Sequence, residues 1–172
     1  MELRTARLRI VPVTPEPSRV ETDRAALADA LGVEIPATWP PPEMRLALGC
    51  WSDALAAQPE LAGWVNWYWL LAAPGSDKLV GYGGFKGLPR ADGVVELGYA
   101  VLDEHQRRGY GSEAITALLE WAWQDRRVTR IDAETRTELT PSIALLTKLG
   151  FRLLPEIDPE VLRYGLDRPA RG

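Results

Sequence analysis

The sequence predicts an α/β (α+β) domain whose helices pack on one mixed sheet. Several short runs alternate apolar and polar residues with the period of a strand, and other segments carry apolar residues at helical spacing. Three of the strand-like runs follow one another with turn residues between them, and helix-like segments stand before and after these three. The predicted order is therefore β, α, α, β, β, β, α, β, α, β, β.

The chain begins with a predicted strand and a short helix. Residues Leu8–Val13 alternate like a half-buried strand, which ends before Pro15 because proline cannot donate to a strand ladder. Thr22 or Asp23 can cap a helix, and Gly32 is a typical residue just past a helix end. A helix is therefore expected between these signals.

The next segment combines a rigid turn with a longer helix. Residues Ile35–Pro42 contain four prolines, a composition that favours a turn. A helix is predicted over about Glu43–Gln58, because its apolar residues recur at intervals of three or four and form one stripe. That stripe consists of Met44, Leu48, Trp51 and Leu55.

Three consecutive strand-like runs predict an antiparallel meander. Val65–Ala73 and Lys78–Phe85 are rich in apolar and aromatic residues, and Pro74–Asp77 has the composition of a hairpin turn. Val94–Val101 is the third run and follows a second turn at Pro89–Gly93.

The second half predicts two more helices with strands around them. The clearest amphipathic helix of the chain runs from Ser112 to about Arg126, and Ile131–Glu134 follows as a short strand. Thr140 as N-cap with Pro141 at the first helical position predicts a helix that ends at Gly150. The last predicted strands are Phe151–Leu154 and Val161–Leu166.

Composition favours a soluble enzyme-sized protein. Its 172 residues suit one domain spanning 1–172, and 46% apolar with 26% charged residues is typical of a globular chain. Cys50 is the only cysteine, which excludes an intrachain disulfide, argues against a metal site and fits a cytoplasmic location. The net charge of -4 argues against nucleic-acid binding. We expect no membrane segment, because the longest apolar stretch is about half the ~20 residues that a spanning helix needs.

A glycine-containing loop opens directly into the clearest helix. Gly109 and Gly111 permit a close backbone approach, so that the amides of about Arg107–Ser112 can converge on an anion at the positive end of that helix. Arg107 and Arg108 add positive charge, which suits a pyrophosphate. The Walker A pattern is absent, and a Rossmann fingerprint would follow the first parallel strand, so a nucleotide triphosphatase is disfavoured.

The loop Gln106–Gly111 resembles the Q/R-x-x-G-x-G/A signature of the GNAT acetyltransferases. Three further segments are similar to the same family, namely Leu3–Ile10, Glu96–Val101 and Ser142–Phe151. The first of these resembles the opening strand of the branch that acetylates ribosomal-protein N-termini. The likeness covers almost the whole chain except about 33–63.

This resemblance implies a fold and a cofactor. Relatives have a mixed, mostly antiparallel sheet with helices on both faces, and strands four and five splay apart to hold acetyl-CoA. Carried over to this sequence, backbone groups along the central strand would pair with the pantetheine, and the loop would bind the diphosphate. The implied cofactor-binding residues are Tyr99, Ala100, Val101, Gln106, Arg107, Arg108, Gly109, Tyr110, Gly111, Ser112, Leu139 and Ser142.

The resemblance also implies direct attack of a primary amine on the thioester, without a covalent enzyme intermediate. A carboxylate would accept the amine proton, with Glu96 as the first candidate and Glu134 as the second; either could instead be a salt-bridged strand residue. Many relatives have an asparagine and a tyrosine where this chain has Leu139 and Leu146. Ser142 is then the remaining donor to the leaving thiolate, unless it only satisfies the first helical turn.

The acceptor is expected to be a small-molecule amine or a protein N-terminus. Trp39, Trp51 and Trp64 are candidates to line its pocket, because indole faces attract ammonium groups, although ordinary packing would also explain them. Two alternatives stay open: transfer of a longer acyl group, and a non-catalytic acyl-CoA sensor. Relatives are often dimers, so a homodimer is a possible assembly.

Overall fold

The computed structural model describes residues 1–73, 75–155 and 158–170. Within these residues, eight strands form one sheet in the order β1-β2-β3-β4-β5-β6-β8-β7. The strands are β1 (Leu3–Arg4), β2 (Leu8–Pro12), β3 (Asn66–Leu71), β4 (Lys78–Phe85), β5 (Val94–Val101), β6 (Arg130–Arg136), β7 (Arg152–Leu153) and β8 (Val161–Asp167). The helices are α1 (Pro15–Ser18), α2 (Arg24–Leu31), α3 (Arg45–Ala57), α4 (Tyr110–Ala122) and α5 (Thr140–Lys148), with 3-10 turns η1 (Pro42–Met44), η2 (Pro59–Leu61) and η3 (Asp103–His105).

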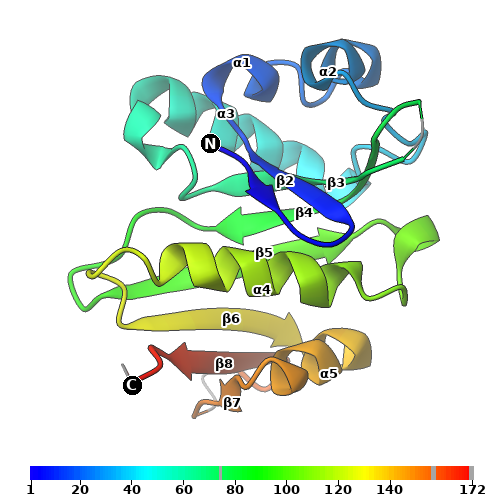
Figure 1. Cartoon of the computed structure of the whole chain (residues 1–172). Coiled ribbons are helices and arrows are strands. Elements are labelled where there is room, and N and C mark those ends of the chain that lie inside the picture. The colour runs from blue at the N-terminus through cyan, green and yellow to red at the C-terminus, as the bar shows by residue number, and fades with distance from the viewer. Residues whose placement is uncertain (74, 156–157, 171–172) are drawn as a thin grey trace.

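Helices cover both faces of the sheet (Figure 1). Helices α1, α2 and α3 lie on one face, and α4 and α5 lie on the other. Successive residues of β3 point to opposite faces, as the pleat requires: Trp67 and Trp69 pack with α4, whereas Tyr68 and Leu70 pack with α2 and α3. The expected mixed sheet with two covered faces is confirmed.

Strands β5 and β6 diverge part of the way along their length. They are the parallel neighbours in an otherwise antiparallel sheet, and their pairing runs from Val94↔Arg130 to Leu97↔Ala133. Gly98–Val101 of β5 continue to pair with β4 but no longer with β6. The edge of β5 that faces β6 is therefore free beyond Leu97, which is the expected splay.

Several predicted element boundaries need correction. Helix α4 begins at Tyr110 rather than Ser112, because Gly109 adopts a left-handed conformation (φ 83°) just before it. The N-cap of α5 is Leu139, so Thr140 is the first helical residue and its side chain makes no capping hydrogen bond. The prediction for α2 is confirmed, because Asp23 accepts from the amides of Ala25 and Ala26 and Gly32 ends the helix at φ 64°.

Two short elements escaped prediction. Strand β1 has two residues and pairs with β2, and α1 begins at Pro15, which sequence patterns treat only as a strand breaker. Proline is compatible with the first helical turn because the amide it lacks would be unpaired there anyway. Of the predicted turn Pro74–Asp77, Pro74 lies outside the described residues. In the part of the chain that the structure describes, no helix combines the length and apolar character needed to cross a membrane.

Candidate active site

The loop between β5 and α4 presents a row of unpaired amides. Arg107 has a φ of 60° and Gly109 a φ of 83°, which turn the backbone so that it enters α4. Within the described ranges, the amides from Arg107 to Ser112 donate to no acceptor; the first amide bonded in the helix belongs to Glu113, which donates to the Gly109 carbonyl at 3.1 Å. Unpaired amides at a helix start carry partial positive charge, so this loop can bind an anion.

Side chains around the loop fix its shape. The Gln106 Nε2 donates to the Val101 carbonyl at 3.1 Å and to Asp103 Oδ1 at 2.8 Å, so this side chain ties the loop to the end of β5. Gly111 is buried, and a Cβ there would approach side-chain atoms of Leu145 and Val101 at 3.2 and 3.3 Å. A side chain is therefore disfavoured at Gly111 by lack of space. At Gly109 glycine is needed because the backbone has a positive φ.

A cavity of about 1120 Å³ lies where β5 and β6 diverge. It joins the free edge of β5, the loop, the first turns of α5 and the proline-rich segment before η1. Its lining comprises 37–42, Tyr82, 97–107, 109–112, 134–136, Leu139, Pro141, Ser142, Leu145, Lys148 and Val161. The structure thus brings together the predicted cofactor residues, with the exception of Arg108.

Two hydroxyl groups, one from β5 and one from α5, form a hydrogen bond in the lining of the cavity. Tyr99 Oη and Ser142 Oγ are 2.9 Å apart, and both residues are half-buried. Burial raises the pKa of the Tyr99 phenol, and the hydrogen bond with Ser142 offsets part of that rise. Tyr99 therefore stays a neutral hydroxyl that can donate a hydrogen bond. Leu146 is fully buried in the core, whereas Leu139 lines the cavity with 48% of its surface exposed.

The two candidate carboxylates occupy different positions. Glu134 is exposed and lines the cavity, on the residue of β6 that follows the last pair with β5. Glu96 and Asp132 are register partners, so Glu96 and Glu134 point to the same face of the sheet. However, Glu96 does not line the cavity and is ion-paired with Lys86. The structure therefore does not bring Glu96 to the site, and the expectation of a base passes to Glu134.

Of the three tryptophans expected at the acceptor pocket, one reaches the cavity. Trp39 lines it together with Tyr82, with the two ring centroids 5.4 Å apart. Trp64 does not line the cavity: it packs against Trp121 on the face of the sheet that α4 covers, at 4.7 Å between ring centroids. Trp51 belongs to α3, packs half-buried against the core on that side of the sheet, and does not line the cavity.

Sequence reasoning missed several residues at the site. It assigns only backbone groups of Tyr99 to the cofactor, and it singles out neither Tyr82 nor Lys148. It predicts no more than a rigid turn for the segment 37–42, although the prolines there form one wall of the cavity. The clustered prolines beside a tryptophan were the available signal, because proline holds a wall in one shape without backbone donors of its own.

A mixed sheet whose parallel strands part beside a loop of unpaired amides is the arrangement that the sequence resemblance to N-acetyltransferases implies. The chain belongs to the GNAT acetyltransferase family, since the profile described as an acetyltransferase (GNAT) domain matches residues 7–152. It is 29% identical over 153 residues, 89% of each chain, to an uncharacterized N-acetyltransferase, YjdG, of Bacillus subtilis.

Solved structures show the same fold. A ribosomal-protein-S5-alanine acetyltransferase from Vibrio fischeri superposes with a TM-score of 0.67 at 14% identity and covers 98% of this chain and 97% of its own. A ribosomal L7/L12 alpha-N-protein acetyltransferase in complex with coenzyme A gives a TM-score of 0.66 at 12% identity, with 97% and 98% covered. Both similarities concern the arrangement of the elements.

Proposed function

We propose that this enzyme transfers the acetyl group of acetyl-CoA to a primary amine by direct attack in a ternary complex. The observation that carries the proposal is one cavity shared by the unpaired loop amides, the free edge of β5 and the Glu134 carboxylate. Coenzyme A bound to a relative of the same fold supports this choice of cofactor. The acceptor is a small-molecule amine or a protein N-terminus, the latter favoured by the ribosomal-protein acetyltransferases among the structural neighbours.

The residues present fit a diphosphate and a pantetheine. Six consecutive loop positions offer unpaired amides, and the exposed Arg107 beside them makes no ion pair with another described residue. Backbone groups of Tyr99 and Val101 lie on the free edge of β5, because strand residues alternate between edges and Ala100 faces β4. An extended amide-bearing chain can pair with that free edge as a strand would. The thioester supplies an activated acyl group, and its leaving thiolate is the conjugate base of a thiol with a pKa of about 8.5.

Each polar group then has a separate task. Glu134 lies at the closed end of the splay beside Gly98 and can accept the proton that the attacking amine must lose. The Tyr99–Ser142 hydroxyl pair lies across the cavity and can donate a hydrogen bond to the departing sulfur. Trp39 and Tyr82 provide an aromatic wall for the acceptor.

The Glu134→Gln variant should lower kcat about tenfold at neutral pH without weakening coenzyme A binding. The loss is modest for a general base because Glu134 is exposed and water can share its role. Steady-state rates between pH 6 and 9 measure the effect, which should shrink as the free amine fraction rises. Glu96→Gln is the matched control on the same face of the sheet, and a larger loss in that variant would return the role to Glu96.

The Tyr99→Phe variant should reduce kcat about threefold to tenfold, since one hydrogen bond to a developing charge is removed. Its KM for the amine should stay unchanged, because the hydroxyl faces Ser142 rather than the aromatic wall. Burst and steady-state assays of thiol release with Tyr99→Phe, Ser142→Ala and the double variant measure the effect. Additive losses would show that the two hydroxyls do not act as a pair.

The proposed function is tested by incubating the protein with acetyl-CoA and a panel of amines and N-terminal peptides. Release of free thiol together with acetylated product is expected for at least one acceptor. Binding of coenzyme A without turnover across the panel would instead favour an acyl-CoA sensor. Faster transfer from propionyl-CoA or a longer thioester would mean that the enzyme transfers that acyl group rather than acetyl.

A further inference from the structure

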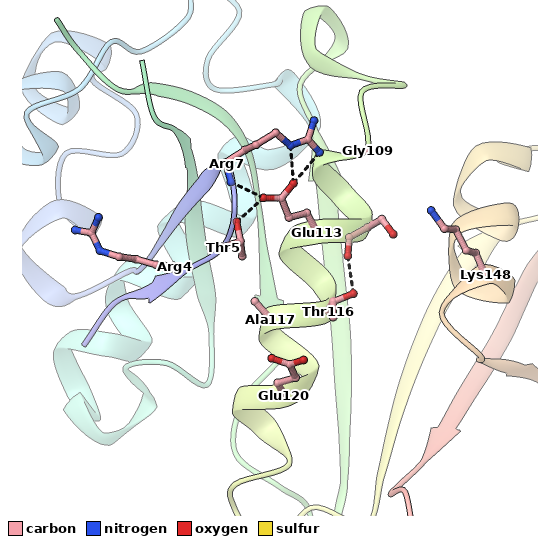
Figure 2. A pocket seen from close by; sticks show the side chains of 10 residues that line it. Arg4, Thr5, Arg7, Gly109, Glu113, Thr116, Ala117, Glu120 and Lys148 are labelled. Atoms are coloured by element: carbon pink, nitrogen blue, oxygen red, sulfur yellow. Dashed lines mark hydrogen bonds and ion pairs between the residues drawn. The ribbon is translucent and has the colours of Figure 1, made fainter. Parts of the chain in front are cut away.

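A shallower groove of about 520 Å³ runs along α4 between the β1–β2 hairpin and α5 (Figure 2). Figure 2 shows that Thr5 and Arg7 of the hairpin point toward Glu113, in the first turn of α4. These residues are more than a hundred positions apart in sequence, and their contact joins the start of the chain to the helix that follows the loop.

Glu113 is held by four contacts from the hairpin. Its Oε1 accepts from Thr5 Oγ1 at 2.5 Å and from the Arg7 amide at 2.8 Å, and its Oε2 lies 2.7 Å from both Arg7 Nε and Nη2. The Glu113 side chain is only 16% exposed. Burial acts to raise its pKa, but the hydrogen bonds from Thr5 and Arg7 outweigh burial and lower the pKa below the ordinary value. The carboxylate is therefore ionised and paired at neutral pH.

The same guanidinium also touches the loop itself. Arg7 Nη1 donates to the Arg108 carbonyl at 3.0 Å, and the guanidinium carbon lies 4.7 Å from the centre of the Tyr110 ring. A Cβ placed on Gly109 would come within 3.3 Å of Arg7 Nη2. Arg7 thus borders three consecutive loop residues, in a segment whose positive φ at Arg107 is unfavourable by itself and persists only with outside support.

Charge gives Arg7 a second effect on the loop. A carboxylate in the first turn of α4 is favourable to the helix, but it would repel a diphosphate bound at the same helix start. Arg7 neutralises this carboxylate without leaving its own charge unpaired. Loss of Arg7 would therefore release the loop backbone and expose the bound diphosphate to an uncompensated negative charge.

We propose that Arg7 is a positioning residue that holds the loop in its anion-binding conformation, so that the N-terminal hairpin sets the affinity for coenzyme A. Thr5 and Glu113 orient the guanidinium, and the contacts with Arg108 and Tyr110 transmit its position to the amides. The inference rests on the proposed function, because it assigns regulation of that cofactor site to residues outside the cavity lining.

The test compares Arg7→Gln, Arg7→Lys and wild type by calorimetric titration with coenzyme A. Arg7→Gln should raise the Kd and the KM for acetyl-CoA about tenfold, the loss expected for one charge-assisted hydrogen bond, with kcat and the KM for the amine unchanged. Arg7→Lys should recover the melting temperature, since lysine can pair with Glu113. It should not recover the affinity, because an ammonium that pairs with Glu113 cannot also keep the hydrogen bond to the Arg108 carbonyl and the contact with the Tyr110 ring.

Arg4→Gln is the matched control, since Arg4 lines the same groove, is exposed and pairs only with Glu2 among the described residues. It should leave the Kd unchanged. If the Kd of Arg7→Gln stays within about twofold of the wild-type Kd, the positioning role is overturned. The same holds if Arg7→Lys binds coenzyme A with the wild-type Kd. Either result leaves the proposed function untouched. Absence of coenzyme A binding by the wild type would overturn the proposed function and the inference with it.

Discussion

The Gly109→Val variant should lose the stabilisation that coenzyme A gives to the wild type. Gly109 has a φ of 83°, a region that β-branched residues strongly disfavour, and its Cβ would also crowd Arg7 Nη2 at 3.3 Å. The loop must shift to relieve both, which moves the amides that start α4. We expect the Kd to rise at least about a hundredfold. At a ligand concentration of about a hundred times the wild-type Kd, the ~2.7 kcal/mol of ligand stabilisation then falls to about 0.4 kcal/mol or less.

Melting curves with and without coenzyme A measure this effect. Gly32→Val is the matched control: Gly32 has a φ of 64° at the end of α2, a Cβ added there would meet nothing within 4 Å, and the residue does not line the cavity. The control should lower the melting temperature through the same backbone strain while keeping the ligand-induced shift. A ligand-induced melting shift of wild-type size in Gly109→Val would show that the loop is not part of the cofactor site.

The loop could be recognised from sequence because its signals are local. Glycines 109 and 111, the arginines and the amphipathic helix are consecutive, and the left-handed Gly109 is what such a helix start requires. The Asp23 cap and Gly32 end of α2 were found for the same reason. These features depend on neighbours a few residues away, so the pattern itself contains the geometry.

Residues whose role depends on distant strands were harder to place. The sequence favours Glu96 over Glu134 as the base, and the structure separates them differently, because β5 and β6 part after Leu97 and Lys86 pairs with Glu96. The position of Trp64 was not predictable, because sequence cannot say which face of the sheet a loop residue joins. The contact between Arg7 and Glu113 depends on how the first strands dock beside α4, which no local pattern encodes.

The Glu21→Gln variant should have a higher free energy of unfolding than the wild type above pH 7 and nearly the same one near pH 5. Glu21 is only 2% exposed; its Oε1 accepts from Tyr68 Oη at 2.5 Å, and its Oε2 finds no partner among the described residues. Burial raises its pKa from 4.5 to about 7, against a smaller lowering by the Tyr68 hydrogen bond. Glutamine keeps the acceptor for Tyr68 and cannot ionise.

The sign follows from proton uptake in the two states. Between pH 4.5 and 7 the unfolded chain has released the Glu21 proton while the folded chain keeps it, so wild-type stability falls as pH rises through that window. At roughly 1.4 kcal/mol per pH unit the fall amounts to about 3 kcal/mol. Urea unfolding at pH 5 and pH 8 measures it, with the exposed Glu60→Gln as control, for which the difference from wild type should be the same at both pH values.

Glu21 also contacts, through its backbone, the cavity wall that is proposed to receive the acceptor. The Glu21 carbonyl accepts from the Trp39 indole nitrogen at 2.8 Å, and Trp39 lines the cavity. Ionisation of Glu21 destabilises the residue whose backbone holds Trp39, so we expect amine affinity to fall above pH 7 in the wild type and not in Glu21→Gln. An equal difference in stability between wild type and Glu21→Gln at pH 5 and pH 8 would contradict the raised pKa of Glu21. It would mean that the folded protein ionises Glu21 as readily as the unfolded chain does.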